Sequence, residues 1–130
     1  MRRYRKIAVY SDGDKRLGAS LLEVADTPEA RRRGLMGRKE LPWICGMVFE
    51  GLSGGGYFWM KNCHIGLDVM FVDDGGTVTK VYSMPADGGD KHYGYDDEAI
   101  AIEVPIGFCR KNGIGKGCKV ALKEIGGGSQ

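Results

Sequence analysis

The chain lacks a long apolar run, and this absence limits where the protein can act. In a sequence of 130 residues, no apolar stretch approaches the roughly 20 residues that a membrane-spanning helix needs. The first residues are basic, as at the start of a secretion signal, but the apolar stretch at residues 7–10 is too short for the core of such a signal. We therefore predict a cytoplasmic protein that does not enter a membrane.

The chain also lacks closely spaced cysteines, and it has only two histidines, His64 and His92. No cysteine pair shows the C-x-x-C spacing of zinc sites, and the histidines have no recognisable metal-ligand spacing. A disulfide framework is not expected in a cytoplasmic chain of this size, although a single disulfide remains an alternative. We predict reduced cysteines, no metal and no cofactor. The four cysteines are Cys45, Cys63, Cys109 and Cys118.

There is no strong excess of charge of either sign, because the formal net charge is only +2. Basic residues cluster at positions 2–6 and 31–33, but only Tyr4 supplies an aromatic group beside them. Surfaces that bind nucleic acid usually combine basic with aromatic side chains. We interpret both clusters as solvated surface and predict no nucleic-acid partner.

Glycine, in contrast, is abundant, with 22 residues in the chain. This content favours many tight turns and disfavours a helical bundle. We predict a mainly β fold: a small antiparallel β-sandwich or barrel of about eight strands with two short helices. A single domain is expected over residues 1–125, followed by a flexible tail at 126–130. The predicted strands cover residues 6–10, 19–25, 46–49, 58–62, 67–72, 77–82, 98–104 and 117–122.

The two helices are indicated by residues that suit helix ends. Thr27 or Asp26 can cap the first helix, Pro28 suits its first position, and the arginines at 31–33 suit its C-terminal end. A second helix is predicted between residues 105 and 112, where Gly113 ends it. Both helices are expected to lie on a β body.

Residues 58–72 are predicted as a strand–turn–strand hairpin around which the rest of the domain is arranged. On its second strand, Leu67, Val69 and Phe71 share one face, and the alternate positions are largely apolar as well. This pattern predicts a central strand that is buried on both sides. Lys61 and Asn62 lie between apolar neighbours, where an unpaired polar group would be unfavourable. Residues 84–97 are expected to be irregular and to form a rim beside the hairpin.

Several motifs occur in an order that is similar to that of a known family. They are TPEAR at 27–31, GLM at 34–36, GMVF at 46–49, FWMKN at 58–62, LD at 67–68 and EVPIG at 103–107. Together they resemble the domain of unknown function 192 family over about residues 21–120. A run such as FWMKN in this order is quite specific.

The resemblance implies a compact β-sandwich or barrel domain of a family without an established activity. Many members of that family carry an N-terminal export signal, and this chain departs from them there. It also departs at Cys118, where the family more often has Asp, and at Cys63, where Thr is common. A carboxylate at position 118 is therefore not indispensable in this chain.

The candidate site is a polar pocket on the hairpin at residues 58–72. In the ligand-binding hypothesis, Lys61 attracts an anionic ligand, while Asn62 and Asp68 supply hydrogen bonds. In the structural alternative, Asn62 closes a turn, and Lys61 pairs with Asp68 or Glu103. Two tyrosines of the 84–97 segment are expected to close over Trp59. The predicted ligand-binding residues are Trp59, Lys61, Asn62, Asp68, Glu103, Tyr93 and Tyr95.

Three classes of function remain open on the sequence alone. The leading hypothesis is a non-catalytic module that binds a small ligand or a protein partner. The alternative is a small, hydrolytic enzyme that uses Glu103, Asp68 or Cys63 together with His92. A third hypothesis is a scaffold or assembly component without a small ligand, which would expose a large apolar patch.

Overall fold

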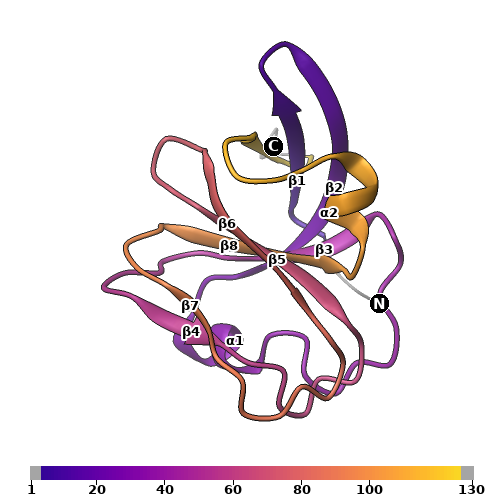
Figure 1. Ribbon diagram of the computed structural model, residues 1–130, viewed down its shortest axis with the longest axis vertical. Helices are drawn as coiled ribbons and strands as arrows, with labels where there is room; N and C mark the ends of the chain where they lie inside the picture. The colour runs from indigo at the N-terminus through magenta and orange to yellow at the C-terminus, as the bar shows by residue number, and fades with distance from the viewer. Residues whose placement is uncertain (1–3, 127–130) are drawn as a thin grey trace.

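The part of the chain that the structure describes folds into two β-sheets with two short helices (Figure 1). The computed structural model describes residues 4–126. Residues 127–130 of the predicted tail, and Arg2 and Arg3 of the first basic cluster, lie outside this described part. The strands are β1 (Lys6–Asp12), β2 (Lys15–Ala25), β3 (Cys45–Phe49), β4 (Gly56–Phe58), β5 (Leu67–Val72), β6 (Val78–Met84), β7 (Tyr93–Tyr95), β8 (Ile100–Pro105) and β9 (Lys119–Glu124). The helices are α1 (Pro28–Arg33) and α2 (Phe108–Asn112).

Seven strands form the large sheet, in the order β6-β5-β8-β3-β2-β1-β9, and β4 pairs with β7 in a small ribbon. Every pair of neighbouring strands is antiparallel except β2 and β3, which are parallel. A parallel pair needs a long crossover, and the segment that contains α1 supplies it. The predicted mainly β fold with two short helices is confirmed, although the large sheet is mixed rather than purely antiparallel.

The two outer strands of the large sheet meet at one point. Thr77 and Lys119 form an isolated bridge, and the Val78 N–H donates to the Cys118 carbonyl at 2.8 Å. The contact does not continue along β6 and β9, so the sheet curls strongly without closing into a barrel. The fold is therefore closer to the sandwich than to the barrel of the sequence prediction.

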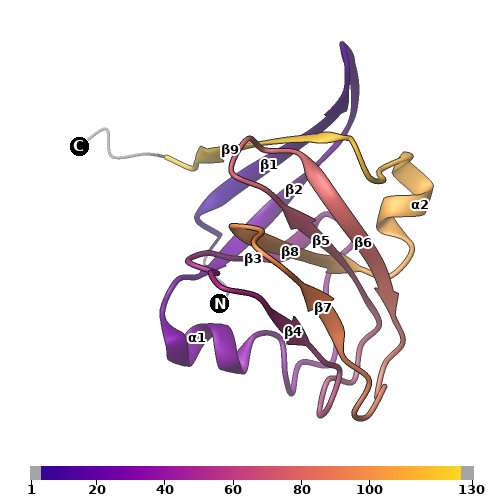
Figure 2. The same ribbon diagram turned by 60° about the vertical axis from the view of Figure 1, so that its left-hand side comes forward.

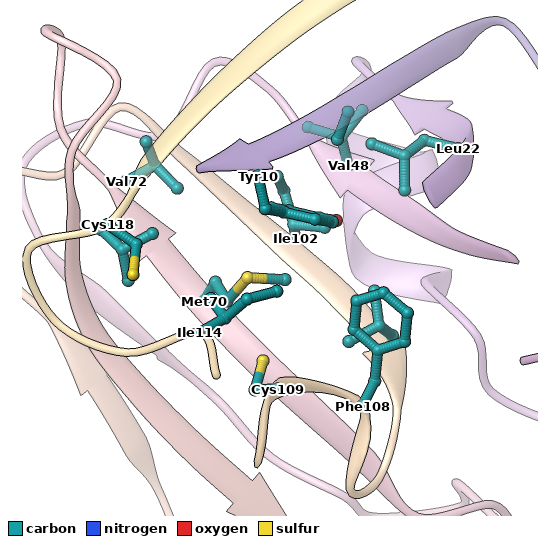
Figure 3. Close-up of a cluster of buried hydrophobic side chains, with 13 residues drawn as sticks. Tyr10, Leu22, Val48, Met70, Val72, Ile102, Phe108, Cys109, Ile114 and Cys118 are labelled. Carbon is teal, nitrogen blue, oxygen red and sulfur yellow. The ribbon is translucent and has the colours of Figure 1, made fainter. Parts of the chain in front are cut away.

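The first of two cores lies on the α2 side of the large sheet (Figure 3). Strands as far apart in the sheet as β1 and β6 contribute to this one cluster, so the sheet wraps around it. Phe108 of α2 packs edge-on against the buried Tyr10 of β1, with the ring centroids 5.8 Å apart. The main buried members are Tyr10, Leu22, Val48, Met70, Val72, Ile102, Phe108, Cys109, Ile114 and Cys118.

The second core lies on the opposite face of the large sheet, beneath α1 and the β4–β7 ribbon (Figure 2). Strand β5 contributes to both cores, because Leu67, Val69 and Phe71 enter the second and Met70 and Val72 enter the first. All six residues of β5 are buried. The predicted central strand, buried on both sides, is confirmed.

The predicted hairpin at 58–72 is wrong. β4 ends at Phe58 and pairs with β7, whereas β5 pairs with β6 and β8 in the large sheet. Residues 59–66 therefore cross from the ribbon to the sheet. The segment at 84–97 was expected to be irregular but contains β7, whose three residues are too few to show an alternating pattern.

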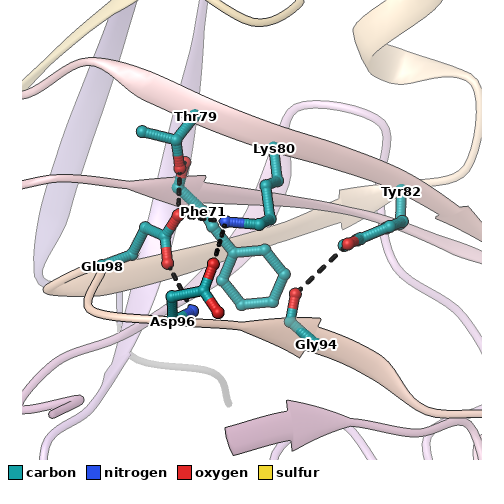
Figure 4. A network of polar contacts seen from close by, with 7 residues as sticks. All are labelled: Phe71, Thr79, Lys80, Tyr82, Gly94, Asp96 and Glu98. Atoms are coloured by element: carbon teal, nitrogen blue, oxygen red, sulfur yellow. Dashed lines mark hydrogen bonds and ion pairs between the residues drawn. The ribbon is translucent and has the colours of Figure 1, made fainter. Parts of the chain in front are cut away.

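A buried carboxylate anchors the ribbon to β6 (Figure 4). Glu98 accepts hydrogen bonds from Thr79 Oγ1 at 2.5 Å, Lys80 Nζ at 2.6 Å and the Asp96 N–H at 2.8 Å. Burial alone would raise the pKa of Glu98, but these bonds outweigh it and lower the pKa to about 2. Farther along β6, the Tyr82 hydroxyl donates to the Gly94 carbonyl at 3.3 Å. The ribbon therefore keeps a fixed position over the second core.

Candidate functional site

A cavity of about 350 Å³ opens between the C-terminal end of α1 and the edge of β4. It lies on the side of the large sheet that carries the second core. Its walls are mostly aromatic and aliphatic, its rim carries the arginines of α1, and its one acidic residue is Glu103. The lining residues are Arg31, Arg32, Arg33, Gly34, Leu35, Met36, Phe49, Leu52, Tyr57, Phe58, Trp59, Met60, Cys63, Tyr95 and Glu103.

Helix α1 forms one wall, and its sequence determines where it starts and ends. Thr27 caps it by accepting a hydrogen bond from the Ala30 N–H at 3.1 Å, and Pro28 takes the first turn, as predicted. The helix ends at Gly34, whose φ of +49° is strained for other residues and where a Cβ would lie 3.3 Å from the Phe49 ring. Gly34 thus lets the chain turn closely over the second core.

The arginines of α1 differ in their contacts. Arg31 Nη1 donates to the Glu50 carbonyl at 2.8 Å, which ties the helix to the end of β3. Arg32 and Arg33 are exposed. Neither guanidinium group has a hydrogen bond or an ion pair within residues 4–126. The rim of the cavity therefore carries two cations whose guanidinium groups are available to a ligand.

The opposite wall is the edge of β4 together with the residues that follow it. Tyr57 and Phe58 of β4 both line the cavity, although consecutive strand residues point to opposite faces, and Trp59 and Met60 after the strand line it as well. A cavity that touches consecutive residues runs along the edge of a strand and not over one face. The other edge of β4 is paired with β7.

Trp59 is held within a small group of exposed side chains. Lys61 Nζ lies 5.3 Å from the centroid of the Trp59 ring, which is a cation–π distance. His92 stacks on Tyr57 with their centroids 3.6 Å apart, and both rings meet Trp59 edge-on at 6.0 Å. Lys61 therefore supports Trp59 and is not itself a lining residue of the cavity.

Glu103 contributes a buried carboxyl group to the cavity. It is only 5% exposed, and it lies on β8 between Met47 of β3 and Val69 of β5. Its carboxyl group has no hydrogen bond or ion pair within residues 4–126. Every fully enclosed side-chain oxygen or nitrogen in this part of the chain has a partner, so the unpaired Glu103 oxygens must reach the cavity. Burial raises the pKa of Glu103 to about 8, which favours the neutral acid near pH 7.

Cys63 lines the cavity near Glu103. Burial raises the pKa of the Cys63 thiol, and a charge on Glu103 raises it further. The thiol donates to the Ile65 carbonyl at 3.6 Å. A thiol in this state is a poor nucleophile, because the reactive form is the thiolate. His92 contacts Tyr57 and Trp59, and it shares no hydrogen bond with Cys63 in the described part of the chain.

Asn62 closes a tight turn and connects the two walls of the cavity. Its φ is +62°, and the Cys63 N–H donates to the Met60 carbonyl at 3.0 Å across the turn. The Asn62 carbonyl in turn accepts from the Gly37 N–H at 3.1 Å, and Gly37 follows α1. This geometry agrees with the structural alternative, in which Asn62 closes a turn. Asn62 thereby helps to hold the two walls of the cavity in position.

Asp68 lies away from the cavity, on the face of β5 that carries the first core. It is 1% exposed and accepts from Ser83 Oγ at 2.7 Å, the Gly107 N–H at 3.1 Å and the Cys109 N–H at 3.0 Å. Asp68 therefore caps the start of α2. The predicted pairing of Lys61 with Asp68 or Glu103 is wrong, because Lys61 lies over Trp59.

The two tyrosines predicted for the site occupy different positions, and only one of them lines the cavity. Tyr95 lines the cavity and stacks on Phe71 with the centroids 5.2 Å apart. Tyr93 is buried against Tyr82 at 5.6 Å and is not a lining residue. Of the seven predicted site residues, the structure brings Trp59, Tyr95 and Glu103 together at the cavity.

The residues that sequence reasoning missed are the arginines of α1 and the apolar wall. The local pattern at Arg32 and Arg33 indicates solvated charge at a helix end, and nothing in it places a cavity beside them. Phe49 has the local pattern of an ordinary core residue, and Leu52 lies in a stretch predicted as a connection. These residues come together only in the tertiary structure, because the cavity forms where α1 and the ribbon meet. No local sequence pattern could have identified them.

The fold and the cavity together define a small, mainly β domain that carries an apolar pocket with a buried carboxyl group. The family model of the domain of unknown function 192 (DUF192), described as an "Uncharacterized ACR", matches residues 9–122. The chain belongs to this family, as the motifs at 27–31, 58–62 and 103–107 predicted.

Two solved structures are similar to this chain over nearly its whole length. One is a protein of Sinorhizobium meliloti 1021 with the description "putative transcription regulator"; the TM-score is 0.85 at 22% identity, covering 95% of this chain and 97% of that chain. The other is a protein of unknown function from Novosphingobium aromaticivorans, with a TM-score of 0.82 at 26% identity, covering 88% of this chain and 83% of that chain. No curated protein matches the chain. The described residues include no helix that is long and apolar enough to cross a membrane.

Proposed function

We propose that this domain is a non-catalytic binding module that holds a small molecule in the cavity between α1 and β4. The observation that carries the proposal is the Glu103 carboxyl group, which is buried in an apolar cavity without a protein partner. The Glu103 oxygens reach the cavity and have no protein partner there. They are therefore free to form hydrogen bonds with a ligand in the cavity.

The rest of the cavity suits such a ligand. A volume of about 350 Å³ falls within the roughly 300–1,000 Å³ that is usual for small-molecule sites. Phe49, Phe58 and Trp59 offer apolar surface for the body of the ligand. A neutral Glu103 can donate one hydrogen bond and accept others, and it therefore suits a carbonyl or hydroxyl group at the buried end.

Binding is favoured over catalysis because the cavity offers one reactive group and no second one in contact with it. Cys63 is the nearest candidate, but its thiol is held protonated and donates to a backbone carbonyl. An activated nucleophile has a base within hydrogen-bond reach, and the Cys63 thiol has no such base among the described residues.

The test is a fluorescence titration with the neutral apolar dye N-phenyl-1-naphthylamine, which brightens in apolar sites. We expect saturable binding to the wild type and loss of binding in Leu52→Trp, whose larger side chain fills the cavity. Leu122→Trp is the matched control, because Leu122 is also partly buried but packs against the first core. Circular dichroism checks that both variants are folded. Absence of dye binding to the wild type, or equal binding by all three proteins, would contradict the proposal.

A further inference from the structure

We infer that the ligand of this cavity is an organic acid, with its anionic group held at the rim by Arg32 and Arg33 and its apolar body inside. This inference rests on the proposed binding function and adds the chemical class of the ligand. The observation behind this inference is the charge at the rim of the cavity. Arg32 and Arg33 make the rim positive, and no carboxylate of the described residues pairs with either of them.

The arginines at the rim differ from the four cations of the described residues that are held in ion pairs. Arg5, Lys6, Arg38 and Lys80 each have a carboxylate partner. Arg38, for example, makes a bidentate contact with Glu23 at 2.6 and 2.9 Å. Arg32 and Arg33 have no such partner within the described residues, although their planar guanidinium groups match carboxylate, sulfonate or phosphate geometry.

Within the described residues, no carboxylate forms an ion pair with Arg32 or Arg33, although Glu29 lies one turn earlier on α1. Glu50, which follows β3, forms an ion pair with Lys6. Asp26, just before α1, pairs with Arg5 at 3.5 Å. Glu103 is the only acidic lining residue, and its burial keeps it neutral until the pH nears its pKa of about 8. Near pH 7 the cavity therefore combines an apolar interior with a cationic rim.

The helix dipole alone explains why cations are tolerated at the end of α1, but it does not explain the cavity beside them. An acid that binds head-outward leaves its charge at the exposed rim, so that the charge is not moved into an apolar medium. Its apolar body then covers Trp59, Phe58 and Phe49, and a polar group at the far end can meet Glu103. One amphiphilic molecule thus satisfies all three regions of the site.

The test compares two dyes that share an aromatic body and differ in charge. The anionic dye is 8-anilinonaphthalene-1-sulfonate, and the neutral one is N-phenyl-1-naphthylamine. We expect the anionic dye to bind about tenfold more tightly at low salt, and the double variant Arg32→Gln/Arg33→Gln to remove that advantage. Affinity for the neutral dye should stay within about twofold. Raising the salt concentration should weaken binding of the anionic dye only.

The control removes two charges elsewhere. Lys15→Gln/Arg16→Gln changes two exposed cations at the turn between β1 and β2 and should leave both affinities unchanged. Equal affinity for the two dyes in the wild type would overturn the acid inference while leaving the binding function intact. An equal loss of both dyes in the arginine variant would also overturn it, because the arginines would then only shape the cavity. If neither dye binds the wild type, the binding function itself fails.

Discussion

Glu103 and Asp68 are buried carboxyl groups on adjacent strands, yet they face opposite sides of the large sheet. Asp68 has three hydrogen-bond donors around it, whereas Glu103 has none. A carboxylate surrounded by donors can stabilise the fold, while one buried without donors opposes it whenever it is charged. We therefore assign Asp68 to the fold and Glu103 to the site.

Glu103 should make the stability of the domain depend on pH in a recognisable direction. Its pKa rises from an ordinary 4.5 to about 8 on folding, so the native state holds a proton that the unfolded chain releases between these values. The free energy of unfolding should therefore fall as the pH rises through this window, by up to about 1.4 kcal/mol per pH unit. Glu103→Gln should remove this contribution and be more stable than the wild type at pH 8.

Urea unfolding at pH 5 and pH 8 measures this difference. Glu40→Gln is the control, because Glu40 is an exposed glutamate and should follow the wild type. If Glu103→Gln and the wild type lose equal stability between pH 5 and pH 8, Glu103 does not stay protonated in the folded protein.

Asn62 should tolerate glycine but not a β-branched residue. Its φ of +62° is accessible to Gly and Asn at little cost, whereas Val is strained there. Asn62→Val should lower the free energy of unfolding by about 1–2 kcal/mol, and Asn62→Gly should remain within about 1 kcal/mol of the wild type. Chemical denaturation measures both, and equal losses in the two variants would mean that the Asn62 side chain, not its backbone, matters.

At the level of elements, α2 depends on β5 for its position. Gly107 and Cys109, at its start, both donate to Asp68, and no side chain of its own caps the helix. Asp68→Ala would leave the buried Cys109 N–H and the partly buried Gly107 N–H without an acceptor. We expect a loss of about 2–4 kcal/mol in the free energy of unfolding, measured by urea titration. Ser83→Ala removes one of the donors to Asp68 and should lower the same free energy by only about 1 kcal/mol; an equal loss in both variants would contradict this role for Asp68.

Local patterns predicted most of the elements but not how they pair. The cap at Thr27, the proline at Pro28 and the alternation in β5 are local signals, and each is observed. The pairing of β4 with β7 is not local, because Tyr57 meets Gly94 across a long stretch of chain. The alternation of side chains along β8 does place Ala101 and Glu103 on one face of the sheet and Ile102 on the other. The sequence does not indicate, however, which of the two faces carries a cavity.

For the whole molecule, the two cores should unfold together. β5 is buried on both sides and joins them, so neither core can lose its packing without exposing this strand. The chain's two tryptophans report on different regions: Trp43 lies 5.5 Å from Phe108 of the first core, and Trp59 lines the cavity above the second. In Trp43→Phe and in Trp59→Phe, the remaining tryptophan's fluorescence should give the same urea midpoint as far-UV circular dichroism. Separate midpoints would mean that the cores unfold independently.

The pairing of β1 with β9 has a consequence for biosynthesis. Lys6 lies opposite Glu124 and Val9 opposite Ala121, so β1 leaves the ribosome more than 100 residues before the strand with which it pairs. Until β9 is translated, the nascent chain cannot complete this edge or cover the apolar side chains that β1 adds to the first core. Contacts between such distant segments form slowly, and apolar segments that are exposed meanwhile are prone to aggregate. The first core is therefore complete only after β9 has been translated.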